Sequence, residues 1–194
     1  MYSIINKGDK VKYPLGTKKI NKNIYYGKRG MGLEEDINSS NNYYLINNIA
    51  VVHKKPTPVQ VTKVLYPEVI IKEAYFKTPS TTDYNGIYKG RYIDFEAKET
   101  KTNFFPIKNI HNHQIKHLQN IEKHGGISFI IIRFTNLNET YYLETNKLLK
   151  FIETETRKSI PIEYFKQNAY LIKDKINPLV DYIEIIEKNI LKGK

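Results

Sequence analysis

Two acids and a lysine, Asp83, Glu96 and Lys98, have residue types and spacing that could support metal-assisted hydrolysis of a phosphodiester. Between residues 91 and 97, apolar and polar side chains alternate, which is the period of a half-buried strand. Glu96 and Lys98 therefore share one face of that strand. Whether Asp83 joins them depends on how the chain turns before the strand.

The chemistry follows from the charges. Two facing carboxylates repel each other unless one is protonated or a cation lies between them. Oxygen ligands without cysteine or clustered histidine favour Mg²⁺ over Zn²⁺, and Mg²⁺ keeps several waters, one of which can become a nucleophile. A neighbouring lysine would orient that water and stabilise the charge that grows on a phosphate. This arrangement indicates a phosphodiesterase site, although the same spacing also fits a solvated strand face that carries an ion pair.

The turn decides whether the two acids meet. A turn at Lys89-Gly90, where glycine supplies the positive φ that tight hairpins require, places Asp83 opposite Glu96. The same register places Thr81 opposite Lys98. Directly opposed residues have Cβ atoms about 4.5 to 5.5 Å apart, so this register would gather a hydroxyl, two acids and a lysine on one face.

A different turn remains open at this stage. Asn85-Gly86 is the stronger turn dipeptide, and a hairpin formed there would pair Asp83 with Tyr88. In that register Glu96 has no acidic partner, so the two hypotheses make opposite predictions about the site.

Other polar residues near this stretch are weaker candidates. The alternation places Asp94 on the same face as Glu96, and we expect it to be solvated or to support the site without binding metal. Four histidines follow, but their spacing matches no standard zinc pattern and the chain has no cysteine: His111, His113, His117 and His124. Gln114, at the start of a predicted helix, is the residue of interest in that segment.

Composition restricts the class of protein. A chain of 194 residues suits one domain with a real core. Its formal charge of +11 and pI near 9.5 indicate a polyanionic partner, and without a transmembrane run or signal peptide we expect nucleic acid rather than membrane. A basic composition from an AT-rich genome is the alternative. The absence of cysteine fits a cytoplasmic location.

The chain predicts a flexible basic arm followed by one domain of strands and helices. Residues 1–28 carry many lysines and no sustained periodicity, and residues 29–194 form the domain. We expect helices over residues 32–47, from about 113 to 124, from Thr145 and from Asn177-Pro178. Strands are expected near residues 49–52, 59–64, 69–76, 91–97, 128–134 and 141–143, and the segment 101–109 is expected to be a loop.

Several runs resemble one known family, the RecU family of Holliday junction resolvases. They are Arg29-Gly30-Met31, residues 33–36, 49–60, 71–77 and 80–101, and the segment that begins His113-Gln114-Ile115 and ends at Gly125-Gly126. The resemblance covers the chain from about Gly27 to its C-terminus and is far more specific than the acidic motif alone.

The resemblance implies a fold, a cofactor and a site. The fold would be α/β and restriction-endonuclease-like, as in the PD-(D/E)xK nucleases, with a mixed central sheet flanked by helices and a projecting β-hairpin stalk within about residues 56–77. Asp83 and Glu96 would bind Mg²⁺, with Mn²⁺ as a possible substitute, and Lys98 would stabilise the transition state. Thr81 and Gln114 would be further ligands of the metal or of its waters.

The resemblance also implies a substrate and partners. The family members are homodimeric endonucleases that cut four-way DNA junctions by paired symmetric cuts in homologous recombination and DNA repair, and recombinase or branch-migration proteins are further expected partners. Basic residues near the site are candidate DNA contacts: Arg29, Lys54, Lys55, Lys72, Lys77 and Arg91.

Two other functions are compatible with these residues. The first is a non-catalytic nucleic-acid-binding or recombinase-modulating protein, in which the basic arm and the tyrosine-bearing hairpin act and the acids are incidental. The second is a related nuclease that acts on linear or flap DNA and shares every residue of the site. Cleavage tests on different DNA structures separate the three.

Overall fold

The protein is described by a computed structural model that covers residues 32–76 and 81–191. All of these residues belong to one compact unit, Met31–Lys194. The basic arm expected at residues 1–28 lies outside the described residues, as do the candidate DNA contacts Arg29 and Lys77.

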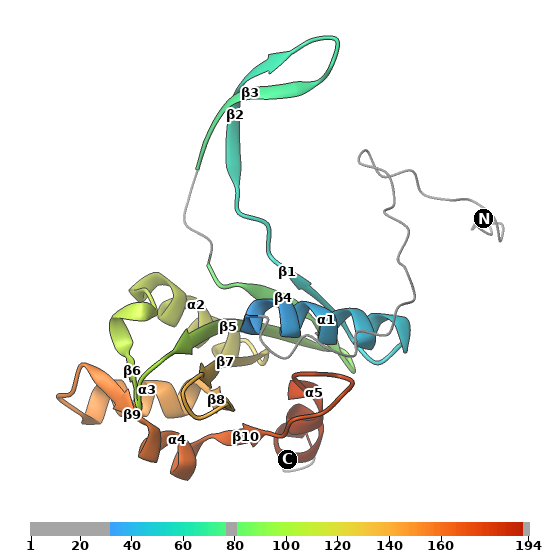
Figure 1. Ribbon diagram of the computed structural model, residues 1–194. Coiled ribbons are helices and arrows are strands. Elements are labelled where there is room, and N and C mark those ends of the chain that lie inside the picture. The colour runs from blue at the N-terminus through green and yellow to red at the C-terminus, as the bar shows by residue number, and fades with distance from the viewer. Residues whose placement is uncertain (1–31, 77–80, 192–194) are drawn as a thin grey trace. The chain divides into compact units, whose positions relative to one another are not determined.

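A six-stranded mixed sheet forms the centre of this unit, in the order β1-β4-β5-β7-β8-β10 (Figure 1). Its strands are β1 (Val51–Lys54), β4 (Tyr84–Tyr88), β5 (Arg91–Thr100), β7 (Ile127–Phe134), β8 (Glu139–Glu144) and β10 (Tyr170–Ile172). β5 and β7 run parallel because helix α2 (Asn112–Lys123) carries the chain back between them, whereas the other neighbours pair antiparallel.

Helices cover both faces of the sheet. The helices are α1 (Leu33–Ile46), α3 (Thr145–Thr154), α4 (Ile162–Asn168), α5 (Tyr182–Ile185) and its π-helical continuation η2 (Ile186–Leu191). On one face, α1 and α5 pack against Phe95 and Phe129. On the other face, α2, α3 and α4 pack against Ile130 and Ile132. The expected α/β fold with a mixed central sheet flanked by helices is confirmed.

The strand pattern explains why two cores form. Successive side chains of a strand point to opposite faces, so the unbroken apolar run of β7 supplies both cores at once. β5 differs, because Ile93, Phe95 and Ala97 lie on one face while Asp94, Glu96 and Lys98 occupy the other. The polar face of β5 is the one that α2 approaches, through a contact between His117 and Asp94.

Some boundaries expected from sequence were wrong. The segment 101–109 contains a short strand, β6 (Phe104–Pro106), which pairs with β9 (Ser159–Pro161), and a 3₁₀ turn, η1 (Ile107–Asn109). The sequence did not predict four short elements, because each has too few residues to show a clear periodicity: β6, β9, α4 and β10. None of the helices in the described part of the chain is long and apolar enough to cross a membrane.

Two helix starts also differ from expectation. Glu144 rather than Thr145 is the N-cap of α3, and the buried Thr145 hydroxyl accepts a hydrogen bond from Ser128, 2.7 Å away. The last helix begins after Asp181, whose side chain accepts from the backbone N–H of Glu184, and not at Asn177-Pro178.

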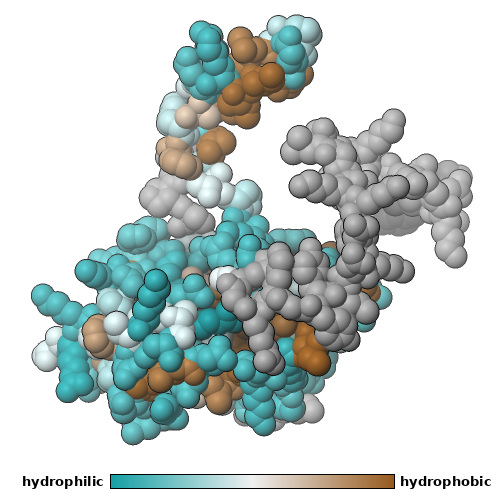
Figure 2. Space-filling view, viewed as in Figure 1, coloured by the Kyte–Doolittle hydropathy of each residue, from teal (hydrophilic) through white to brown (hydrophobic). Residues whose placement is uncertain are grey.

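The expected stalk is a hairpin with a sheet of its own. β2 (Val59–Leu65) pairs antiparallel with β3 (Ile70–Phe76), apart from the six-stranded sheet. Most of its residues are exposed, including large apolar ones, and Figure 2 shows this hydrophobic surface on the hairpin. The exposed apolar side chains are Val59, Leu65, Tyr66, Val69, Ile70, Ile71, Tyr75 and Phe76.

One glycine sets how closely β1 approaches β4. Gly86 lies opposite Val52 in the ladder, and a Cβ atom at position 86 would stand 2.2 Å from the backbone oxygen of Val51 and 2.6 Å from Cα of Val52. Because backbone atoms cannot yield as a side chain can, this position accepts only glycine without a shift of β1.

We therefore expect Gly86→Ala to lower the free energy of unfolding by roughly 2 to 3 kcal/mol, as overpacked positions do. Urea denaturation followed by circular dichroism measures the change. Gly90→Asn is the matched control, because Gly90 has φ +74 with nothing within 4 Å of its Cβ position, and asparagine tolerates that backbone conformation. Equal losses in the two variants would contradict the close approach of β1.

Candidate active site

The hairpin that joins β4 to β5 has the register that brings the acids together. Tyr88 pairs with Arg91 and Tyr84 with Phe95, so the turn lies at Lys89-Gly90, where both residues have positive φ. The expected Lys89-Gly90 register is confirmed. The alternative turn at Asn85-Gly86 is wrong, because both of these residues lie inside β4.

Asp83, Glu96 and Lys98 form a compact cluster beyond the end of this ladder. The backbone N–H of Asp83 donates to Glu96 Oε2 at 3.1 Å, and the N–H of Ala97 donates to Asp83 Oδ2 at 3.1 Å. Lys98 Nζ donates to Glu96 Oε1 and lies 3.5 Å from Asp83 Oδ2. The three residues expected to be catalytic are thus within direct reach of one another.

Burial and charge perturb the titration of this cluster. Glu96 is fully buried, and this burial, together with the nearby charge of Asp83, raises its pKa to about 7 against the opposing effect of Lys98. Burial alone would lower the pKa of Lys98, but the hydrogen bond and charge of Glu96, with the charge of Asp83, outweigh it and raise that pKa. One ammonium therefore faces two carboxylates, which leaves an excess of negative charge.

A shallow cavity opens beside Lys98, with a volume of about 560 Å³. It lies between the start of α1 and the second half of β5, and it is lined by Gly32, Leu33, Glu34, Glu35, Ala97, Lys98 and Glu99. Two acids of the first turn of α1 therefore face the cavity that Lys98 also lines. The third, Asp36, pairs instead with Arg133 at 2.7 Å.

The donor set fits a hard divalent cation. Asp83 and Glu96 present carboxylate oxygens in one place, and burial together with the charge of Asp83 raises the pKa of Glu96, so a cation bound there would stabilise its ionised form. Within residues 32–76 and 81–191, no group of three or more histidine, cysteine, aspartate and glutamate side chains gathers to hold a metal. Two carboxylates suffice for Mg²⁺, because this ion is bound through one or two carboxylates and keeps several waters.

The two further ligands expected from the resemblance occupy different positions. Thr81 is exposed and its hydroxyl accepts a hydrogen bond from Lys55 at 3.1 Å. Gln114 is buried near the start of α2, where its side-chain oxygen accepts from the backbone N–H of His111 at 2.9 Å. This bond caps the helix and orients Gln114. The roles of Thr81 and Gln114 as metal ligands stay predictions.

Asp94 is not solvated. It is fully buried, and four donors surround its carboxylate: Lys55, Thr82, Tyr92 and His117. Thr82, Tyr92 and His117 carry no signal in isolation. The strand and helix periodicities taken together do indicate that Asp94 and His117 lie near the site. Asp94 shares a strand face with Glu96, and His117 lies three residues after Gln114 on one helix face.

The candidate DNA contacts in the described part of the chain lie on several elements. Lys54 is half-exposed and pairs with Glu34, and Lys72 is exposed on β3. Arg91 is exposed and donates to the backbone oxygen of Gly125 at 3.3 Å. Lys55 differs from these three, because its ammonium points inward onto Asp94. Their contacts with DNA stay predictions.

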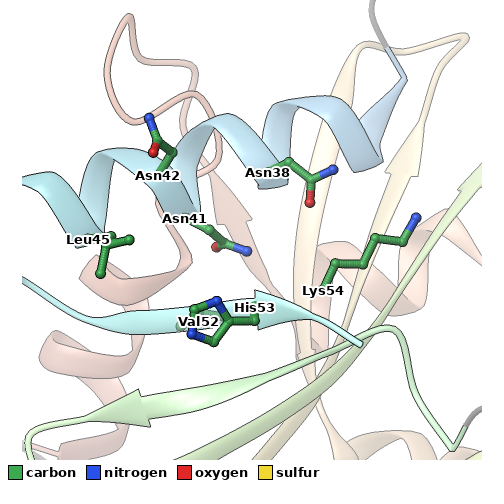
Figure 3. A pocket seen from close by; sticks show the side chains of 7 residues that line it. All are labelled: Asn38, Asn41, Asn42, Leu45, Val52, His53 and Lys54. Carbon is green, nitrogen blue, oxygen red and sulfur yellow. The ribbon is translucent and has the colours of Figure 1, made fainter. Parts of the chain in front are cut away.

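A second groove runs along the sheet edge, between α1 and β1 (Figure 3). It has a volume of about 210 Å³ and is lined by Asn38, Asn41, Asn42, Leu45, Val52, His53 and Lys54. Asp83, Glu96 and Lys98 do not line it, so this polar groove is separate from the acid cluster.

Fold and cluster together define an α/β protein with a candidate acid-lysine metal site. The chain belongs to the RecU family, since the family model described as Recombination protein U matches residues 28–188. The resemblance of its sequence runs to this family is thereby confirmed.

Curated relatives match almost end to end. A Holliday junction resolvase RecU of Geobacillus sp. (strain WCH70) is 53% identical over 193 residues, covering 91% of this chain and 96% of the relative. Another of that name, from Pediococcus pentosaceus, is 47% identical over 197 residues, covering 93% and 98%. A solved structure of Archaeoglobus fulgidus Hjc, a Holliday junction resolvase, is 11% identical, with a TM-score of 0.44 and coverage of 70% of this chain and 90% of that chain.

The raised pKa of Glu96 predicts how stability depends on pH in the absence of metal. Between pH 4.5, the ordinary pKa, and about 7, the folded protein binds more protons at this residue than the unfolded chain does. Stability is therefore greatest below this window and falls as pH rises through it. Relative to Glu96→Gln, we expect the wild-type protein to lose about 1 to 3 kcal/mol between pH 4.5 and 8.

Urea denaturation in EDTA at a series of pH values measures this difference. Glu96→Gln keeps the shape of the side chain and cannot ionise there, so it isolates the contribution of one carboxyl group. Parallel stability curves for the two proteins would show that Glu96 titrates normally.

Proposed function

We propose that the protein is a Mg²⁺-dependent, structure-selective endonuclease that resolves Holliday junctions by paired symmetric cuts. The observation that carries the proposal is the convergence of Asp83, Glu96 and Lys98 in a chain whose full-length relatives are named Holliday junction resolvases. Hydrolysis of a phosphodiester is the chemistry that two carboxylates and a lysine around a hard cation support.

Each residue of the cluster has a distinct role. Asp83 and Glu96 would hold the cation, which would supply positive charge to activate a bound water and to offset charge on the phosphate. Glu96 must be ionised to do so, and its raised pKa couples cation binding to loss of a proton. Lys98 remains an ammonium and faces both acids, so it can stabilise the charge that develops on a phosphate placed in the adjacent cavity.

Paired cuts require two equivalent sites. A four-way junction has two-fold symmetry, so a two-fold homodimer presents one site to each of two strands of like polarity. Lysine and arginine side chains supply salt-dependent affinity for the DNA backbone, and DNA shape selects the substrate. Mn²⁺ substitutes for Mg²⁺, and the enzyme acts in the cytoplasm with recombinase or branch-migration partners.

Removing either acid should abolish cleavage and spare binding. For Asp83→Asn and Glu96→Gln, we expect the rate of cutting a synthetic four-way junction in Mg²⁺ to fall at least about 10³-fold, because the cation loses a charged ligand. Gel-shift affinity in Ca²⁺ should change little. Asp174→Asn, which removes an exposed acid outside the cluster, is the control and should cut normally. Normal cutting by both cluster variants would remove these residues from the site.

Substrate choice is tested with DNA of three shapes. The wild-type protein should cut a four-way junction at two symmetric positions and much faster than flap or linear duplex DNA of the same sequence. Equal cutting of all three would indicate a nuclease without selectivity for junctions. Tight junction binding with no cutting in Mg²⁺ or Mn²⁺ would indicate a non-catalytic binding protein.

A further inference from the structure

A buried polar cluster lies directly beside the candidate active site, centred on Asp94. Its Oδ2 accepts from Lys55 Nζ at 2.7 Å, Tyr92 OH at 3.0 Å and His117 Nε2 at 3.2 Å, and its Oδ1 accepts from the Thr82 hydroxyl. Asp94 is 0% exposed. A buried carboxylate is costly unless it is paired and hydrogen-bonded, and here every side of it meets a donor.

The lysine of this cluster faces inward. The Lys55 side chain is 15% exposed, and its ammonium donates to Asp94, to the Thr82 hydroxyl and to the Thr81 hydroxyl. Its backbone N–H donates to the carbonyl oxygen of Asp83 at 2.7 Å. Side chain and backbone of Lys55 are therefore both committed to the segment 81–83, and little of the ammonium is left for a DNA phosphate.

The cluster ties together four parts of the fold. Lys55 follows β1, Thr82 precedes β4, Asp94 lies on β5 and His117 comes from α2. Thr82 is fully buried and stands between Thr81 and Asp83, so fixing its hydroxyl also fixes the backbone on which both neighbours sit. Fully satisfied buried polar networks restrict a site to one arrangement.

From these contacts we infer that the Asp94–Lys55 pair, acting through Thr82, is a positioning device. It holds the segment 81–83 so that the Asp83 carboxylate faces Glu96 before the cation arrives. Asp94, Lys55 and Thr82 contact neither the cation nor the DNA. The inference rests on the proposed function, because it assigns these residues to the metal site of that function.

Thr82→Val gives the sharpest test, because it removes the hydroxyl that links the pair to the segment and changes neither charge nor size greatly. Thr145→Val is the matched control, since Thr145 is also 0% exposed and its hydroxyl also makes a buried hydrogen bond, to Ser128. The measurement is the stabilisation of free protein by Mg²⁺ and by Mn²⁺, followed as the shift in melting temperature with metal concentration.

We expect the metal concentration for half of the full shift to rise about 5-fold to 10-fold in Thr82→Val and to stay at the wild-type value in Thr145→Val. Both variants should lose a similar amount of thermal stability in EDTA. An unchanged midpoint in Thr82→Val, or an equal rise in both variants, would overturn the inference and leave only a role in stability.

The position of Lys55 is tested separately through DNA binding. Lys55→Met leaves the buried Asp94 carboxylate without the charge of the lysine, so the double variant Lys55→Met/Asp94→Asn is used, in which both charges are gone. Affinity for a four-way junction is measured in Ca²⁺ at several salt concentrations. We expect the slope of log affinity against log salt to match the wild-type slope. We also expect the metal concentration for half of the full melting-temperature shift to rise as it does in Thr82→Val. A slope reduced by about 1 would identify Lys55 as a phosphate contact and overturn the inference.

Failure of the proposed function looks different from failure of this inference. If neither Mg²⁺ nor Mn²⁺ changes the melting temperature of the wild-type protein, both the metal site and the positioning role are overturned. A wild-type protein that responds to metal, with a Thr82→Val variant that responds equally, overturns the positioning device alone.

Discussion

The repulsion between Asp83 and Glu96 is the constraint on which the rest of the site depends. The fold holds the two carboxylates together with one lysine for compensation, and the charge of Asp83 adds to the effect of burial in raising the pKa of Glu96. A protein does not gather like charges in its interior without structure that prevents their separation. The elements around Asp83 and Glu96 keep the two carboxylates from moving apart.

Three features supply this restraint. The Lys89-Gly90 turn sets the register, Gly86 lets β1 lie close against β4, and β5 pairs with β7 through Glu96, just beyond the end of the β4–β5 ladder. The Asp94 cluster adds a polar connection from β1 and α2 to the same place. The acids are therefore restrained from several elements at once, as a preorganised site requires.

The sequence predicted most strands of the central sheet, and one of its two possible registers for the acid cluster, because those features are local. Strand alternation and a two-residue turn at Lys89-Gly90 offered the register that places Asp83 against Glu96, but they did not exclude the rival turn at Asn85-Gly86, which the structure rules out. The short pair β6 and β9 was missed because three residues hold no period, and the environment of Asp94 was missed because Lys55, Thr82 and His117 come from separate parts of the chain. Alternation indicates which face a residue occupies and does not indicate whether a helix covers that face.

The attachment of the β2–β3 hairpin has a consequence for variation in length. The chain leaves the sheet at Lys55 and returns at Thr81, and the hydrogen bond between these two side chains closes the excursion at its base. Closing a loop costs free energy that grows only with the logarithm of its length, about 0.6 kcal/mol for each doubling. The hairpin can therefore gain or lose residues at its tip while the residues beside Asp83 keep their places.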